Sequence, residues 1–141
     1  MSPFAVRRAT FRDAPAILEL WRLADAEPTR TDDEASICSL IAHDPDALLV
    51  AEDEGELVGS VIAAFDGWRG TFFRLTVLPA RRRYGIGRAL VAVGERSLRE
   101  RGAARVTLYA IKAEAGAEAF WLATDYAPDD RTARYVKNLE P

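Results

Sequence analysis

The amino-acid sequence predicts an α+β protein with a mixed, mainly antiparallel central sheet and helices on both faces of that sheet. Length is the first observation, because 141 residues suffice for one domain over residues 1–141 but not for two separate cores. Composition is the second, since 49% apolar and 29% charged residues are typical of a globular protein with a packed core. The third is the order of patterns along the chain, β-α-α-β-β-β-α-β-α-β, in which an antiparallel meander precedes one strand–helix–strand crossover.

The N-terminal region is expected to hold one strand and two helices. Residues 4–9 are the first strand candidate, and the capping residues 10–13 together with Pro15 predict that a helix follows directly. Apolar residues at helical spacing support this helix: Ile17, Leu20, Trp21 and Ala24. A second helix is predicted to begin near Thr31, whose hydroxyl can cap it while Glu34 reaches back, and to end near residues 44–45.

Three strands are expected to follow as an antiparallel meander. Residues 47–51 and 57–65 are apolar runs joined by the turn residues 53–56, which is the pattern of a hairpin. A second turn over 66–70 leads into 71–78, a run rich in β-branched and aromatic residues that ends at a proline.

The C-terminal part begins with a strand–helix–strand crossover. A helix is predicted over residues 86–101, ended by a glycine, and a strand over 105–110. A further helix over 114–123 and a closing strand over 132–139 complete the expected order.

Composition excludes several classes of protein. The chain has no run of about 18 apolar residues, and its N-terminus lacks the apolar stretch of a signal peptide, so a cytoplasmic protein is expected. A single cysteine, Cys38, and a single histidine, His43, cannot make an internal disulfide or a Cys/His zinc site, so we expect no metal. A net charge of −3 gives no reason to expect a nucleic acid or a membrane as partner.

One segment combines several features of an anion-binding loop. Residues 82–87 lie between a predicted strand and a predicted helix, where unpaired backbone N–H groups and the helix dipole favour an anion. Glycines remove side chains that would hold a phosphate away from the backbone, and four arginines surround the segment: Arg81, Arg82, Arg83 and Arg88. A P-loop is excluded because Arg88 follows the second glycine, and a dinucleotide fingerprint because Leu90 stands where a third glycine is needed.

These residues resemble the acyl-CoA signature of the GNAT N-acetyltransferases. Val77-Leu78-Pro79 matches the family's Val-x-Pro, and residues 82–90 match its Arg/Gln-x-x-Gly-x-Gly/Ala. The order of elements is also similar to that of the family, and the spacing of Trp21, the acidic second helix and residues 66–70 resembles a group of small bacterial members. The resemblance implies a GNAT-like fold and acetyl-CoA as the cosubstrate. It further implies that the diphosphate and the pantetheine arm contact two groups of residues: Arg82, Arg83, Tyr84, Gly85, Ile86, Gly87 and Arg88 for the former, and Leu75, Thr76 and Val77 for the latter.

A second, weaker similarity covers the helix expected over 114–123. It resembles the family's Asn-x-x-Ala-x-x-x-Tyr helix, which implies that Ala117 and Trp121 lie beside the cofactor. Trp121 stands where a tyrosine often protonates the leaving thiolate. Either solvent therefore protonates that thiolate, whose ordinary thiol pKa is about 8.5, or a different residue does so.

The acceptor side is less clearly marked in the sequence. An amine must lose a proton before it attacks, yet residues 71–78 contain no carboxylate. Asp66 is therefore the candidate base, acting directly or through water, with Asp25 and Glu27 as alternatives. Three residues are candidates for the acceptor pocket: Trp21, Asp25 and Trp68.

The leading hypothesis is a cytoplasmic N-acetyltransferase that transfers the acetyl group of acetyl-CoA to a primary amine by direct attack in a ternary complex. The acceptor can be a small molecule or a protein amine. A non-catalytic acyl-CoA-binding module is the alternative, because the tyrosine and the strand carboxylate of the family are absent. An exposed closing strand would also allow a homodimer.

Overall fold

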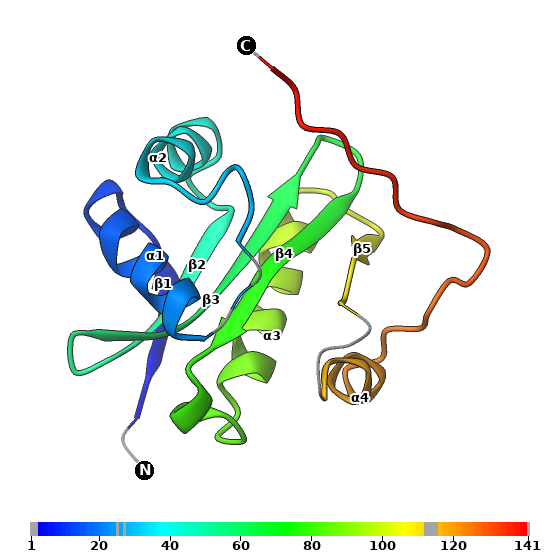
Figure 1. Cartoon of the computed structure of the whole chain (residues 1–141). Coiled ribbons are helices and arrows are strands. Elements are labelled where there is room, and N and C mark those ends of the chain that lie inside the picture. Colours follow the sequence, from blue (N-terminus) through cyan, green and yellow to red (C-terminus); the bar gives the residue numbers. More distant parts are fainter. Residues whose placement is uncertain (1–2, 25, 27, 112–115, 141) are drawn as a thin grey trace. The chain divides into compact units, whose positions relative to one another are not determined.

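The computed structural model describes residues 3–24, 26, 28–111 and 116–140. Two compact units make up the chain, and the boundary between them lies between Leu108 and Tyr109. The first unit contains the whole sheet and three of the helices, and the second contains one short helix and the C-terminal residues (Figure 1).

Five strands form the sheet of the first unit, in the order β1-β2-β3-β4-β5. Their bounds are Ala5–Arg8 for β1, Leu48–Asp53 for β2, Glu56–Phe65 for β3, Gly70–Val77 for β4 and Val106–Leu108 for β5. The first four strands pair in antiparallel fashion, and β5 lies parallel to β4. The mixed, mainly antiparallel sheet, its meander and its single crossover are therefore confirmed.

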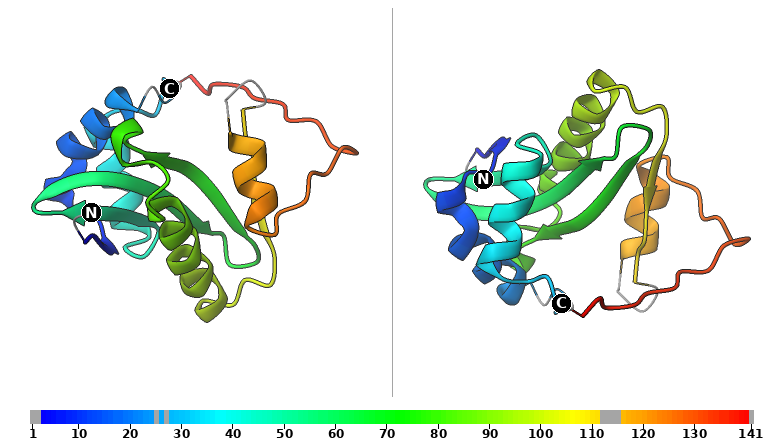
Figure 2. Two further views of the ribbon diagram at one scale, coloured as in Figure 1. Left: turned by 90° about the horizontal axis from the view of Figure 1, so that it is seen from below. Right: turned by 90° about the horizontal axis from the view of Figure 1, so that it is seen from above.

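Helices cover both faces of this sheet (Figure 2). Helices α1 (Ala14–Leu23) and α2 (Glu34–His43) lie on one face, and α3 (Ile86–Glu100) lies on the other. Neighbouring residues of β3 show this directly: Ser60 bonds to a side chain of α1, whereas the α-carbon of Gly59 faces Ile86 and Leu90 of α3. Successive strand residues point to opposite faces, so each layer has its own set of contacts.

The core on the side of α1 and α2 follows from the helical spacing seen in the sequence. Ile17, Leu20 and Ile37 are buried together with Val50 and Ile62 of the sheet. The helices are thus held by apolar burial, which contributes about 1.5–3 kcal/mol for each fully buried large side chain.

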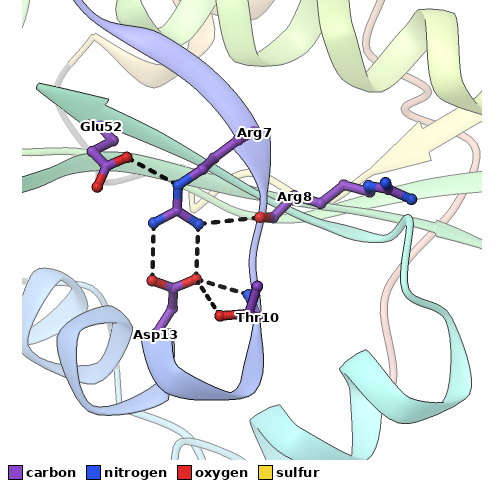
Figure 3. A network of polar contacts seen from close by, with 5 residues as sticks. All are labelled: Arg7, Arg8, Thr10, Asp13 and Glu52. Atoms are coloured by element: carbon purple, nitrogen blue, oxygen red, sulfur yellow. Dashed lines mark hydrogen bonds and ion pairs between the residues drawn. The ribbon is translucent and has the colours of Figure 1, made fainter. Parts of the chain in front are cut away.

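A polar network ties the N-terminal strand to its neighbours (Figure 3). The guanidinium of Arg7 donates two hydrogen bonds to the carboxylate of Asp13, at 2.8 and 3.0 Å, and one of 3.0 Å to Glu52 on β2. Asp13 also accepts from the backbone N–H of Thr10 at 2.7 Å. Together these bonds fix the short 3-10 turn Phe11–Asp13 between β1 and α1.

Two expectations are wrong in detail. The N-cap of α2 is Asp33, whose side chain accepts from the backbone N–H of Ser36 at 2.7 Å, rather than Thr31. Residues 132–139 form no strand. Their large apolar side chains are exposed, 92% in the case of Tyr135, so no burial stabilises a strand there. The helix expected over 114–123 is α4 (Ala117–Ala123), and Glu114 lies outside the described residues.

Candidate functional site

The edge of β4 is only partly covered by β5. Pairing between these strands extends over Gly70, Thr71 and Phe72 of β4, and β5 ends at Leu108. Within the described residues, β5 therefore does not pair with the second half of β4. This leaves the stretch from Leu75 to Val77 with one neighbouring strand, β3.

Backbone groups of that stretch alternate in direction. The N–H of Leu78 donates 3.0 Å to the carbonyl of Val58, so Leu78 and Val58 form a hydrogen-bonded pair. In an antiparallel ladder such pairs alternate with pairs that point their groups outward. Thr76 opposite Ser60 is accordingly bonded to β3, whereas the backbone N–H and C=O of Val77 point to the outer edge. Of the three residues expected to contact pantetheine, Thr76 has its backbone already paired.

The arginines after β4 have different roles. Arg81 lies in the 3-10 turn Pro79–Arg81, and its Nη2 is 2.8 Å from Oδ2 of Asp53, at an angle outside hydrogen-bond geometry. Arg81 therefore neutralises a buried carboxylate and is not available to a ligand. The side chain of Arg82 donates from Nε to the carbonyl of Val77 at 3.2 Å, while those of Arg83 and Arg88 are exposed.

The N-terminus of α3 presents a row of backbone N–H groups. In the described part of the chain, none of the six amides from Arg83 to Arg88 has a hydrogen-bond acceptor, and the amide of Ala89 is the first to bond, to the carbonyl of Gly85 at 3.0 Å. Four unbonded N–H groups are usual at a helix start. Here the preceding loop adds two more. With the helix dipole and the nearby guanidinium groups, this row has the kind of donors that a phosphate or diphosphate requires.

Glycine at position 85 is required by the turn into α3. Gly85 is the N-cap residue of α3 with φ of +84°, and no heavy atom lies within 4 Å of the place where its Cβ would be. The left-handed conformation favours glycine, and the open space leaves the backbone accessible. Arg83 also has a positive φ, +69°.

A second glycine, which is not among the predicted site residues, positions this loop. A Cβ on Gly59 of β3 would lie 2.9 Å from Ile86 and 3.0 Å from Leu90, both in the first turns of α3. The N-terminus of α3 therefore packs directly on the backbone of β3. A glycine inside an otherwise apolar strand is the signal that indicates such a close approach.

Asp66, the candidate base, lies in the turn between β3 and β4. Its Oδ1 accepts from the backbone N–H groups of Trp68 and Arg69 at 2.8 and 2.7 Å, and these bonds hold its pKa below the ordinary value, the Arg69 bond having the largest effect. The turn joins β3 and β4 at Phe65 and Gly70, at the opposite end of β4 from the loop after Val77. Both the lowered pKa and this position argue against a proton-accepting role.

The two acceptor candidates that the structure describes, Trp21 and Trp68, have different surroundings. Trp21 is a core residue, 5% exposed, and its indole N–H donates to the hydroxyl of Ser60 at 2.9 Å. Trp68 lies in the turn after β3, 68% exposed, with the guanidinium of Arg69 at 3.9 Å from its ring centre. Asp25 and Glu27 lie outside the described residues.

Trp121 and Ala117 belong to α4 in the second unit. The ring of Trp121 contacts Phe120 and Tyr126 edge to face, with ring centres at 5.0 and 5.2 Å. These aromatic contacts hold Trp121 within its own unit. Its expected place beside a cofactor, like that of Ala117, stays a prediction.

The part of the chain that the structure describes contains no cluster of three or more His, Cys, Asp or Glu residues suited to a metal ion. None of its helices has the length and apolarity needed to cross a membrane.

Comparisons with known proteins identify the family and the fold of the chain. Residues 14–126 match the model of the acetyltransferase (GNAT) family. An acetyltransferase of Pectobacterium atrosepticum is 41% identical over 96 residues, which are 68% of each chain. The crystal structure of the PaiA N-acetyltransferase from Thermoplasma acidophilum in complex with coenzyme A has a TM-score of 0.76 at 14% identity, covering 86% of this chain and 88% of that one. An aminoglycoside acetyltransferase from an uncultured soil metagenomic sample has a TM-score of 0.77 at 20% identity, with 97% of both chains covered. The chain belongs to the GNAT family of acetyltransferases.

Proposed function

We propose that this acyltransferase uses acetyl-CoA to acetylate a primary amine, and that the loop from Arg82 to Arg88 binds the diphosphate of the donor. The observation that carries the proposal is the row of six backbone N–H groups without acceptors at the start of α3, next to exposed arginines. Backbone N–H groups and guanidinium groups are the donors that phosphate oxygens prefer. A single-domain organisation over residues 1–141 and a cytoplasmic location belong to the same proposal.

The outer edge of β4 supports a second contact with the donor. The pantetheine arm of coenzyme A carries two amide groups, which can pair with a strand edge as a neighbouring strand does. Val77 offers backbone groups on that edge, beyond the end of the pairing with β5. Arg82 covers the carbonyl of Val77 and must move for that oxygen to accept a new hydrogen bond.

The chemistry that acetyl-CoA supplies is an acyl group activated as a thioester. In direct transfer, the nitrogen of a neutral amine forms a bond to the acetyl carbon, the bond to sulfur breaks, and a thiolate leaves. The amine loses one proton and the thiolate gains one. Solvent water serves both steps in this proposal, because the carboxylate of Asp66 is held in its turn with a lowered pKa.

The acidic residues at the start of α2 give no reason to expect a cationic acceptor. Asp32 forms an ion pair of 2.6 Å with Arg74, and Asp33 caps the helix. These carboxylates are therefore used within the protein, and they give no preference for a cationic amine. Small-molecule and peptide amines both belong in the acceptor screen.

The experiment is a thiol-release assay with acetyl-CoA and a panel of amines, namely amino acids, polyamines, aminoglycosides and peptides with free N-termini or lysines. Mass spectrometry of the product must show a gain of one acetyl group on nitrogen. Turnover with at least one amine supports the proposal. Binding of acetyl-CoA without transfer to any member of a broad panel would favour the non-catalytic binding module, which no comparison supports.

A further inference from the structure

We propose that this acyltransferase acetylates Lys137 of its own chain and recognises that lysine through the apolar side chains on either side of it. The inference rests on the proposed function and deepens it, because it names an acceptor amine. Lys137 lies in the second unit, within residues 133–140, which we call the lysine segment.

The backbone of the lysine segment forms no regular structure. None of its residues lies in a helix or a strand, and Figure 1 shows the chain running there as coil. The backbone N–H of Thr132 donates to the carbonyl of Asp129 at 3.4 Å, and in the described part of the chain residues 133–139 make no backbone hydrogen bond. An acceptor site can therefore bind these residues as an extended peptide without first breaking backbone hydrogen bonds.

The side chains of the segment are exposed to solvent. Arg134 contacts the ring of Tyr109, with 5.1 Å between the guanidinium carbon and the ring centre. Three residues farther along the chain, Lys137 is exposed. Water can therefore take a proton from its ammonium group, which must lose one before the nitrogen can attack a thioester.

Lysine is scarce in this chain. Lysine and arginine together number 19, and only Lys112 and Lys137 are lysines. A guanidinium group stays protonated and therefore does not accept an acetyl group as an amine does. Because Lys112 lies outside the described residues, Lys137 is the one side-chain amine in the part of the chain that the structure describes.

Large apolar side chains flank this amine. Tyr135 is 92% exposed and Leu139 is 82% exposed. In an extended chain, residues two positions apart point to the same side. Bound as an extended peptide, the segment would thus present Tyr135 and Leu139 on either side of the Lys137 amine. Burial of these side chains in an acceptor site would remove apolar surface from water, which favours binding.

The transfer step balances in atoms and charge. Nζ of Lys137, in its neutral form, forms a bond to the acetyl carbon of acetyl-CoA, the bond from that carbon to sulfur breaks, and coenzyme A leaves as a thiolate. The amine gives one proton to solvent, and the thiolate takes one. The products are coenzyme A and an acetylated lysine, which has lost its positive charge.

Incubation of the full chain with acetyl-CoA, in a buffer without amines, tests the inference. The concentration of acetyl-CoA is kept below its dissociation constant, and peptide mapping by mass spectrometry follows the acetyl group at each lysine. We expect acetylation of Lys137 at a rate at least about ten-fold higher in the wild type than in Gly85→Val, whose donor loop is altered. The matched control is Gly55→Val, which strains a glycine of similar φ outside that loop and should react at the wild-type rate.

A second variant removes the amine alone. Lys137→Arg keeps the positive charge of the side chain. It should gain no acetyl group within the lysine segment. It should still acetylate an amine of the panel at the wild-type rate, because Lys137 takes no part in binding the donor.

Recognition of the flanking side chains is tested by Tyr135→Ala. The rate at Lys137 should fall about five-fold, because less apolar surface is buried in the acceptor site. Melting temperature should stay unchanged, since so exposed a side chain contributes little to the fold. Phe11→Ala is the control, because Phe11 is an exposed aromatic residue, 57% exposed, in the turn before α1. This variant should keep the wild-type rate at Lys137.

The outcomes separate this inference from the proposed function. Equal rates at Lys137 in the wild type and Gly85→Val would indicate an uncatalysed reaction and overturn the inference. An unmodified Lys137, or acetylation of Lys112 alone, in a wild type that acetylates an amine of the panel would also overturn it, and the proposed function would stand. A wild-type rate in Tyr135→Ala would overturn the recognition of the flanking side chains. A folded wild type that neither binds acetyl-CoA nor acetylates any amine would overturn the proposed function, and the inference with it.

Discussion

The guanidinium of Arg7 and the carboxylate of Asp13 face each other through two hydrogen bonds, at 2.8 and 3.0 Å (Figure 3). This contact closes the turn between β1 and α1. The hydrogen bonds from Arg7 hold the pKa of Asp13 below its ordinary value, with a further contribution from the N–H of Thr10. The carboxylate is therefore stabilised in its charged form by the folded state.

Replacement of Asp13 by Asn should make stability less dependent on pH in acid. A pKa lowered by folding means that the carboxylate adds stability above its unfolded pKa and that this contribution is lost as the pH falls through the folded value. We expect Asp13→Asn to lose about 1 kcal/mol of unfolding free energy at pH 7, and the difference from wild type to close below about pH 3. Urea denaturation at several pH values measures this. Asp46→Asn is the control, because the pair of Asp46 with Arg8 is exposed and should contribute nothing measurable.

Two adjacent arginines should give opposite results on replacement. Arg82→Ala removes a guanidinium of the proposed diphosphate site, so affinity for acetyl-CoA should fall about ten-fold with little change in melting temperature. Arg81→Ala leaves the buried carboxylate of Asp53 without its partner, so melting temperature should fall while affinity stays near wild type. Calorimetry and thermal denaturation on both variants measure the two effects. Equal losses of affinity in the two variants would show that Arg81 and Arg82 act only through the general positive charge of this surface.

Alanine variants of two closely packed glycines distinguish an effect on packing from an effect on acetyl-CoA binding. A Cβ on Gly59 would lie 2.9 Å from Ile86 at the start of α3, and one on Gly94 would lie 2.8 Å from Phe72 farther along the helix. Both alanine variants should lose about 1–3 kcal/mol of unfolding free energy through overpacking. Only Gly59→Ala should also weaken acetyl-CoA binding, because it displaces the end of α3 that carries the N–H groups of the proposed diphosphate site. If Gly94→Ala weakens acetyl-CoA binding as much as Gly59→Ala does, the affinity depends on the overall stability of the protein and not on the position of this end of α3.

Asp66→Asn should leave acetyl transfer and its pH profile unchanged. An asparagine side chain can accept the same two backbone hydrogen bonds within the turn, so the hairpin is retained. Initial rates from pH 6 to 9 with an acceptor found in the panel measure this. A large loss of rate in Asp66→Asn, together with a shift of the alkaline side of the pH–rate profile, would show that Asp66 is the base.

Most of the fold could be predicted because its signals are local. Helical spacing in α1, turn residues between β2 and β3, and the glycine at the start of α3 each specify their own element. The closing strand predicted over 132–139 is absent from the structure. A strand needs a pairing partner and a buried face, and the sequence of those residues specifies neither.

The signals for the proposed phosphate loop are likewise local in sequence, but those for the acceptor side are not. Trp21, Ser60 and Arg74 belong to three separate elements, and only the folded sheet brings them together. An arginine with a positive φ leaves no mark in the sequence, because glycine is the residue that normally signals that conformation. Trp21 was expected in a pocket and lies in the core, since a tryptophan on an apolar helix face fits both places.

Calorimetric titration of acetyl-CoA into the wild type, Gly85→Val and Gly55→Val tests whether the loop at the start of α3 binds the donor. Gly85 and Gly55 have φ of +84° and +82°, and neither has a heavy atom within 4 Å of its missing Cβ, so valine strains both backbones alike. A donor site at this loop predicts that the wild type and Gly55→Val bind acetyl-CoA with similar affinity, that Gly85→Val binds at least about ten-fold more weakly, and that NADH and ATP do not compete. Equal affinity in the two valine variants, or no binding of acetyl-CoA by the folded wild type, would contradict it.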